Sequence, residues 1–143
     1  MKFNLILGEE YEGEVVIYAK EENATVSAIR AICESDEKNI VGYSERKIYT
    51  LSPYEIDCFV SEKDQLFAYC SEGKLRIKSR LSKIEEELPS CFLRINQSCI
   101  ANMNMIERFD ASFSGTLGVV FKNGYRDYVS RRNLKKVKER IGI

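Results

Sequence analysis

The chain has 143 residues, of which 44% are apolar and 31% charged, with only two prolines. This is the composition of a folded globular protein rather than a disordered one, and the length suffices for one full core with a small appended unit. The apolar runs at residues 5–7 and 15–19 are too short to span a bilayer, and the N-terminus lacks the apolar segment of a secretion signal. We therefore expect a cytoplasmic protein.

Equal totals of 22 Lys+Arg and 22 Asp+Glu hide a segregated charge. Residues 1–62 hold 6 Lys+Arg against 13 Asp+Glu, whereas residues 63–143 hold 16 against 9. The basic part of such a chain can lie against a polyanion while the acidic part faces away. The alternative is a solvated surface on which the charges happen to separate, and charge alone does not decide between the two.

The chain contains no histidine, which excludes Ser-His and Cys-His catalysis and zinc sites that use histidine. The five cysteines form no Cys-x-x-Cys pair, and most have apolar neighbours, so small buried hydrophobes are favoured over redox or metal roles. Phosphate-binding glycine loops and zinc-protease motifs are also missing from the sequence. We expect no enzymatic activity, no cofactor and no metal site.

The first 46 residues predict a small αβ unit with an acidic surface. Residues 2–7, 14–20 and 39–44 have the composition of strands. Asn23 is a suitable N-cap for a helix whose apolar residues recur at helical spacing.

The remaining residues, 47–143, predict mostly strands. Asn123-Gly124 is the strongest hairpin signal in this part of the chain. One short helix is expected over residues 79–88, where Pro89 ends it. Strands are expected at residues 47–51, 54–60, 65–70, 74–78, 105–109, 116–122 and 125–129.

A final helix is predicted after Ser130, a natural N-cap, with one apolar side and many basic residues. Arg131 and Arg132 fall in its first turn, where the helix dipole and unpaired N–H groups already disfavour cations. A bound phosphate or a guanine edge would reverse that penalty. Pairing of both arginines with carboxylates such as Asp127 or Glu107 is the alternative, and the residues alone leave it open.

Two fragments, FLRINQSCIAN at residues 92–102 and VSRRNLKKV at residues 129–137, resemble the LytTR family of bacterial DNA-binding domains. The likeness extends over residues 48–143. The positions that follow the family pattern in order are Phe92, Arg94, Ile95, Ser98, Ile100, Asn102, Ser130, Arg131, Arg132 and Leu134.

The resemblance implies a mainly β fold with short helices, an elongated antiparallel β domain, here preceded by the small N-terminal αβ unit. It also implies a transcriptional regulator that binds double-stranded DNA through loops and short helices reaching into successive major grooves. The implied contacts come from the loop at Lys63 and Gln65, the turn at Arg94, Asn96 and Gln97, and the helix start at Arg131, Arg132 and Lys135. Lys78, on a basic strand face, completes the candidate set.

Within this set, Arg94, Lys78 and Lys135 are expected on phosphates, and Asn96, Gln97 and Arg132 near bases. An Asn or Gln side chain can bond adenine N6 and N7 together in the major groove. Asn96 and Gln97 depart from the residues usual in the family, which are His and then Lys, Arg or Asn. These two positions are therefore where we expect this protein's own sequence preference.

The division into residues 1–46 and 47–143 leaves no room for the receiver domain of many LytTR response regulators, which needs about a hundred residues or more. By resemblance, the expected partners are promoter DNA with direct repeats, a second copy in a homodimer on DNA, and a small membrane protein acting as inhibitor. A second hypothesis is a protein-interaction module that works through the acidic N-terminal unit. A single-strand or RNA-binding variant would need exposed aromatic residues such as Phe67 and Tyr69.

Overall fold

The computed structural model describes residues 4–10, 15–34, 38–111 and 115–143 of the chain. The chain divides into two compact units, Met1–Asp36 and Glu37–Ile143. Within the described ranges, no helix is long and apolar enough to cross a membrane.

The N-terminal unit contains one helix, α1 (Ala24–Glu34), and none of its described residues is buried. The predicted cap is confirmed, since Asn23 Oδ1 accepts a hydrogen bond from the Val26 N–H at 3.0 Å. The strands predicted at residues 2–7 and 14–20 are wrong where the structure describes them, because residues 4–7 and 15–19 pair with no strand. A strand exists only as part of a ladder, so strand composition without a partner segment leaves an extended chain.

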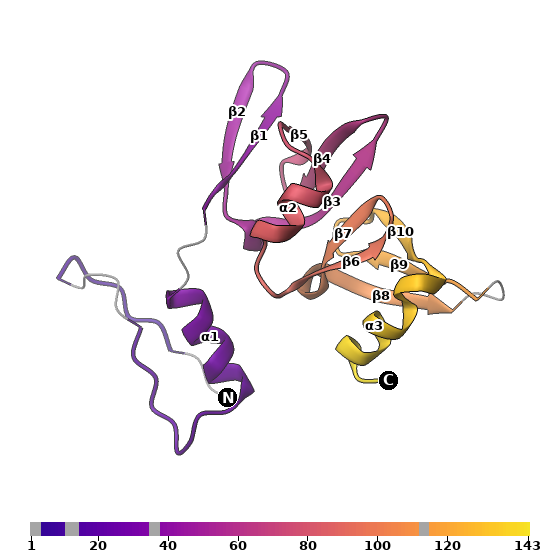
Figure 1. Cartoon of the computed structure of the whole chain (residues 1–143). Coiled ribbons are helices and arrows are strands. Elements are labelled where there is room, and N and C mark those ends of the chain that lie inside the picture. The colour runs from indigo at the N-terminus through magenta and orange to yellow at the C-terminus, as the bar shows by residue number, and fades with distance from the viewer. Residues whose placement is uncertain (1–3, 11–14, 35–37, 112–114) are drawn as a thin grey trace. The chain divides into compact units, whose positions relative to one another are not determined.

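The larger unit is built from two antiparallel sheets, and the predicted class of a mainly β fold with short helices is confirmed (Figure 1). One sheet has seven strands in the order β2-β1-β5-β4-β3-β7-β6, and the other has three in the order β10-β9-β8. The strands of the first sheet are β1 (Ile40–Ser44), β2 (Lys47–Leu51), β3 (Ile56–Glu62), β4 (Gln65–Cys70), β5 (Gly73–Ile77), β6 (Phe92–Asn96) and β7 (Cys99–Asn102).

The second sheet consists of β8 (Ile106–Ala111), β9 (Leu117–Phe121) and β10 (Arg126–Val129). The helices are α2 (Leu81–Glu87) and α3 (Arg131–Ile141), with 3-10 turns η1 (Pro53–Glu55) and η2 (Met103–Met105).

The hairpin of β1 and β2 belongs to the seven-stranded sheet of the larger unit. Gly42 of β1 pairs with Ile77 of β5, and a Cβ atom at Gly42 would lie 2.9 Å from the Leu75 Cβ atom, so only glycine allows this approach. The predicted division after residue 46 passes through this hairpin, whereas the compact units divide after Asp36. The pairing of β1 with β5 is a long-range contact that local composition does not reveal.

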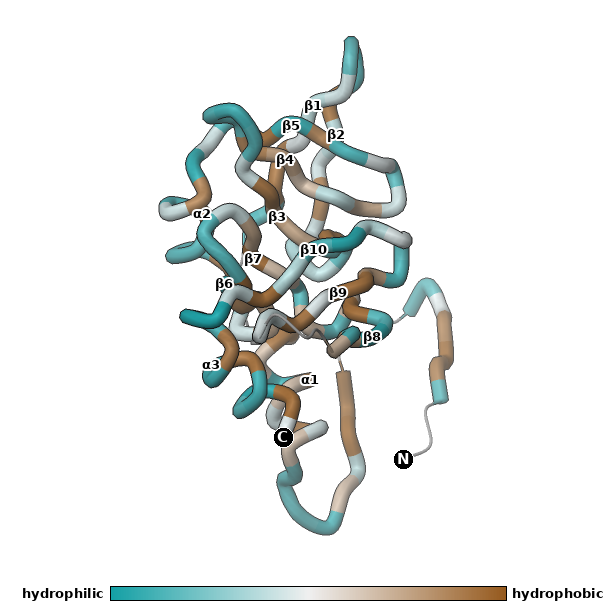
Figure 2. The backbone as a smooth tube through the Cα atoms, turned by 90° about the vertical axis from the view of Figure 1, so that its right-hand side faces the viewer, coloured by the Kyte–Doolittle hydropathy of each residue, from teal (hydrophilic) through white to brown (hydrophobic). Residues whose placement is uncertain are grey.

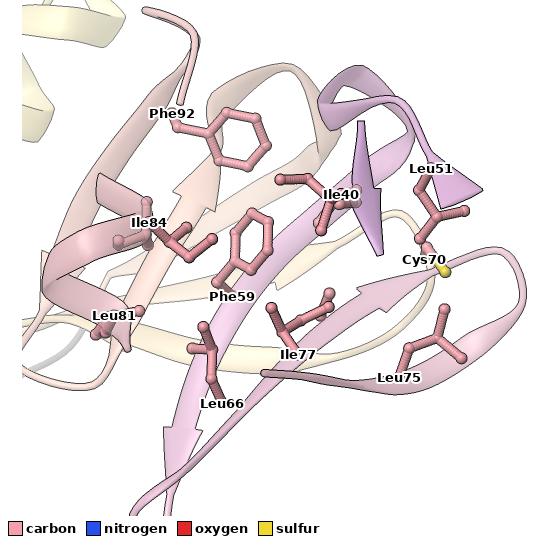
Figure 3. Close-up of a cluster of buried hydrophobic side chains, with 13 residues drawn as sticks. Ile40, Leu51, Phe59, Leu66, Cys70, Leu75, Ile77, Leu81, Ile84 and Phe92 are labelled. Carbon is pink, nitrogen blue, oxygen red and sulfur yellow. The ribbon is translucent and has the colours of Figure 1, made fainter. Parts of the chain in front are cut away.

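Strand β3 supplies two hydrophobic cores, one on each face of the large sheet. Phe59 points into a core that includes Leu66 and Ile84 and lies between the sheet and α2 (Figure 3). Its neighbours Cys58 and Val60 point to the other face, into a core shared with the small sheet and α3. Because side chains alternate along a strand, a strand buried on both faces reads as a continuous apolar run.

Candidate nucleic-acid interface

Three connections gather at one end of the large sheet, and we call them together the turn edge. They are the β3–β4 turn (Lys63 and Asp64), the β6–β7 turn (Gln97 and Ser98) and the start of α3 (Arg131 and Arg132). The first two are neighbours because the Ser61 N–H donates to the Ser98 carbonyl at 2.8 Å. The last two are neighbours because the Ser130 N–H donates to the Ile95 carbonyl at 2.9 Å. The three predicted contact regions thus come together through backbone pairing between segments distant in sequence.

The β3–β4 turn is a tight two-residue hairpin. Glu62 pairs with Gln65, which leaves Lys63 and Asp64 as the turn residues, with φ of 48° and 64°. Hairpins of this kind need positive φ at both positions and usually contain Asn-Gly. Left-handed backbone costs about 1–2 kcal/mol at a residue with a side chain, and less at Asp. The turn projects the exposed Lys63 side chain from the end of the sheet, with exposed Gln65 beside it.

The β6–β7 turn separates two neighbouring amides that the sequence treats alike. Gln97 is exposed, whereas Asn96 is only 2% exposed. The Asn96 Nδ2 group donates to Asp127 Oδ1 and to the Tyr128 carbonyl, both at 2.8 Å, and its Oδ1 atom accepts from the Ser98 N–H at 2.8 Å. Both donors and the carbonyl oxygen of this buried amide are in use, so the expected base contact of Asn96 would require these hydrogen bonds to break. Gln97 keeps the amide edge available.

Arg94 braces the same turn rather than presenting its guanidinium to solvent. It donates to the carbonyls of Asn96 at 3.3 Å and Gln97 at 2.7 Å, and it forms an ion pair with Glu85 of α2 at 2.5 Å. Its side chain is 28% exposed. Each of its three guanidinium nitrogens thus donates within the protein, so the structure shows Arg94 supporting the turn, and its expected phosphate contact stays a prediction.

The last helix packs by a single apolar side against β6 of the large sheet and β10 of the small sheet. Val137 is fully buried and Leu134 packs against the same core. At 100° per residue, Arg131, Arg132 and Lys135 share an arc of about 100° on the opposite side. Figure 2 shows this alternation of hydrophilic and hydrophobic residues along α3. All three basic residues are exposed.

Ser130 occupies the N-cap position of α3 as predicted, but it makes no side-chain cap bond to the helix. Its hydroxyl accepts a hydrogen bond from the Asn133 side chain at 2.8 Å instead. The Arg131 side chain lies against Gly115, since a Cβ atom at Gly115 would lie 3.3 Å from its Nε atom.

Asp127 and Glu107, the carboxylates that the sequence offered as ion-pair partners for the two arginines, bond to other residues. Asp127 accepts from Asn96, Tyr125 and the Tyr128 backbone. Glu107 forms an ion pair with Arg108 at 2.9 Å. Over the ranges that the structure describes, Arg132 has no carboxylate within ion-pair distance.

Lys78 lies next to the turn edge but not on it. The pairing of Ile77 with Leu66 puts Lys78 beside Gln65 at the same end of the sheet. Its Nζ atom lies 4.3 Å from the ring centroid of Tyr43, a cation–π contact that directs it over the outer sheet face.

The sequence pattern missed two residues at this interface. Tyr128 is 49% exposed and Arg126 is exposed on the same side of β10. The period-two pattern after the Asn123-Gly124 hairpin carried the signal, because it places Arg126 and Tyr128 on one face. Among the described residues, no group of three or more Cys, Asp or Glu side chains is placed to hold a metal ion.

Known proteins place this fold in a family. The family model described as the LytTr DNA-binding domain matches residues 46–142. Uncharacterized HTH-type transcriptional regulators of Staphylococcus aureus strains NCTC 8325 / PS 47 and COL are 33% identical over 146 residues, covering 100% of this chain and 99% of theirs. A solved LytTr DNA-binding domain from Bacillus cereus shares the fold, with a TM-score of 0.69 at 19% identity over 74% of this chain and 98% of that chain. The chain therefore belongs to the LytTR family of DNA-binding domains.

Proposed function

We propose that this chain is a sequence-specific transcriptional regulator that lays its turn edge on double-stranded DNA and reads major grooves. One observation carries the proposal: an exposed amide, Gln97, and an exposed arginine, Arg132, lie on neighbouring segments. A backbone hydrogen bond from Ser130 to Ile95 joins these segments. Both side chains belong to the types that recognise base edges, Gln for adenine and Arg for guanine.

The spacing of the turn edge suits a duplex. Neighbouring strands lie about 4.8 Å apart, so the β3–β4 and β6–β7 turns, two strand positions apart, are separated by about 10 Å. The major groove is about 12 Å wide. Gln97 and Arg132 can therefore approach the bases of one groove while Lys63 reaches toward the phosphates that border it.

Electrostatics supports the same placement. The larger unit, residues 37–143, holds 19 Lys+Arg against 14 Asp+Glu, whereas residues 1–36 hold 3 against 8. Lys63, Lys135 and Lys78 are the proposed phosphate contacts around the base-reading pair. Arg131 is proposed as a further backbone contact at the start of α3, where helix N–H groups favour anions.

We further propose that two copies occupy paired direct repeats in promoter DNA as a homodimer. The support is the family resemblance and the small size of the turn edge, which covers one short site. A palindromic site would instead reflect two-fold symmetry between the copies.

Footprinting on the DNA upstream of the gene, combined with a salt titration, tests the proposal. A protected pair of direct repeats is expected, and log affinity should fall linearly with log salt, with a slope of about −0.9 per phosphate contacted. Affinity that does not depend on salt, or equal protection of every sequence, would overturn it.

A second function, protein interaction through the N-terminal unit, is favoured by one observation. Leu5, Ile6, Leu7 and Tyr18 are 67–95% exposed in a unit with eight carboxylates. Such apolar exposure beside acidic residues suits a protein partner, for example a small membrane protein that inhibits DNA binding. Deletion of residues 1–36 tests it: unchanged DNA affinity with lost control of transcription supports a partner site, and intact control rejects it.

A further inference from the structure

Asp127 is a carboxylate in the middle of a surface otherwise suited to DNA. Its Oδ1 atom accepts hydrogen bonds from Asn96 Nδ2 and from the Tyr128 N–H, both at 2.8 Å. Its Oδ2 atom accepts from the Tyr125 hydroxyl at 2.9 Å. Three donors from two strands and one turn thus converge on one half-buried side chain.

We infer that Asn96 and Asp127 form a clasp that fixes the β6–β7 turn to the start of α3, so that Gln97 and Arg132 meet DNA as one rigid reading unit. This inference rests on the proposed function, because it names the residues that position the two base-reading side chains. Neither clasp residue is a base contact. Each acts through a neighbour, Asn96 through Gln97 and Asp127 through the strand that leads to Arg132.

The bonds around Asn96 show how the turn is held. Its Oδ1 atom fixes the Ser98 N–H, directly after Gln97, while its Nδ2 group reaches across to β10. The Tyr128 carbonyl, which also accepts a hydrogen bond from Asn96, lies two residues before Ser130, the N-cap of α3. The backbone hydrogen bond from the Ser130 N–H to the Ile95 carbonyl also joins the start of α3 to β6. The turn and the helix start cannot shift independently without breaking these bonds.

The clasp is anchored to the core through Tyr125. The Tyr125 ring stacks on Tyr69 with centroids 4.2 Å apart and lies 5.8 Å from Phe121. Burial and the hydrogen bond to Asp127 raise the pKa of Tyr125 far above its ordinary value, so its hydroxyl remains a donor at every physiological pH. The Asp127 carboxylate therefore keeps the hydrogen bond from Tyr125 together with those from Asn96 and Tyr128. These protein donors offset its negative charge, which reduces its repulsion of DNA phosphates.

This arrangement makes a prediction about selectivity rather than stability alone. Interactions that pre-organise a binding surface improve the specific complex most, since random DNA does not need the exact geometry. Loss of the clasp should leave contacts between lysines and phosphates intact and impair the joint fit of Gln97 and Arg132.

The experiment compares affinity for the protected promoter site with affinity for a random duplex, using the full chain below its melting temperature. Asn96→Asp puts two carboxylates face to face and should weaken promoter binding by about tenfold or more, with random binding little changed. Adding Asp127→Asn restores a donor opposite the new carboxylate and should recover much of that loss. In the Asn96→Ala background, Gln97→Ala should have much less effect than in the wild-type chain.

The hydrogen-exchange rates of the Ser98 and Tyr128 backbone amides test the clasp in the absence of DNA. Both amides should exchange faster in Asn96→Ala than in the wild-type chain. The inference is overturned if Asn96→Asp leaves the ratio of promoter to random affinity unchanged, or if Asp127→Asn fails to restore it. A wild-type chain that binds promoter and random DNA equally would instead overturn the proposed function, and faster amide exchange would still support the clasp.

Discussion

The two units of this chain contain similar kinds of apolar residues and use them differently. Leu7 in the N-terminal unit is 84% exposed, whereas Leu66 in the larger unit is 2% exposed. The charges differ in the same way, since the N-terminal unit is acidic and the larger unit is basic. Apolar content therefore does not produce a hydrophobic core by itself. A core forms where strands pair and bring apolar residues from distant segments together, as β3 does between two faces of one sheet.

The largest expected difference between the units is in core substitutions. Phe121→Ala, at a fully buried position next to the clasp, should lower the free energy of unfolding by about 3–5 kcal/mol. The matched change Leu7→Ala should alter it by about 0.5 kcal/mol or less, because that side chain is exposed. Urea unfolding monitored by circular dichroism measures both. A cost at Leu7 that matches the cost at Phe121 would show that the N-terminal unit is buried by something in solution.

A pair of deletions tests where the units divide. Removal of residues 1–36 should leave the melting temperature of the larger unit nearly unchanged, because both of its cores lie outside that segment. Removal of residues 1–45 also takes away β1, uncovers Leu75 and should cost about 2–5 kcal/mol, comparable to a severe core substitution. Calorimetry of the two shortened chains compares them. Equal melting temperatures would mean that β1 contributes nothing to the sheet.

Substitution of one arginine in each unit compares their contributions to DNA affinity. Arg132→Ala should weaken binding to the promoter site by about 1 to 3 kcal/mol, the range for a good bidentate base contact. Arg30→Ala in α1, where the arginine pairs with Glu22 at 3.2 Å, should leave the affinity unchanged. Fluorescence anisotropy with labelled duplexes measures both. An equal loss on random DNA would reduce Arg132 to a phosphate contact.

The smallest effect concerns pH and a buried carboxyl of the larger unit. Burial raises the pKa of Asp57 above 3.8, partly offset by a hydrogen bond from Asn123 at 2.7 Å and by Lys122. The folded chain therefore binds this proton more tightly than the unfolded chain, so the contribution of Asp57 to stability is present below pH 3.8 and is lost as pH rises through the raised pKa.

Comparison with Asp57→Asn isolates this contribution. The stability of the wild-type chain minus that of the variant should fall as pH rises from below 3.8 toward neutrality. Chemical unfolding at several pH values gives the difference. A difference that rises with pH would mean that Lys122 and Asn123 outweigh burial.

Much of the larger unit could be predicted from the sequence. Alternating and apolar runs place most of its strands within a few residues, β6 and β7 excepted, and Pro89 and Ser130 mark where helices end and begin. The family fragments at residues 92–102 and 129–137 are enough on their own to indicate a DNA-binding fold. In the N-terminal unit the same rules find α1 but assign strands that have no partner.

Roles within the site were harder to predict. Asn96 and Gln97 are adjacent amides of similar chemistry, and only the register of β6 and β7, with β10 beside them, buries one and exposes the other. Arg94 is likewise directed to backbone carbonyls and Glu85 by the position of α2. The sequence suggests Asp127 only as an ion-pair partner for the arginines, yet its carboxylate accepts three hydrogen bonds in the structure.

The sequence by itself determined the family, most of the strands and both helices of the larger unit, the segregation of charge and the exclusion of histidine chemistry. These depend on local composition, periodicity and motifs, which are present in the linear chain. Only the tertiary structure decided that β1 belongs to the large sheet, that Asn96 is buried while Gln97 is exposed, and that Asp127 accepts hydrogen bonds from the protein. The physical reason is that pairing, burial and hydrogen bonding at these residues come from distant segments, 32 positions away for Asn96 and Tyr128 and 35 (77 − 42) for Gly42 and Ile77. No local pattern specifies which partner a polar side chain will meet.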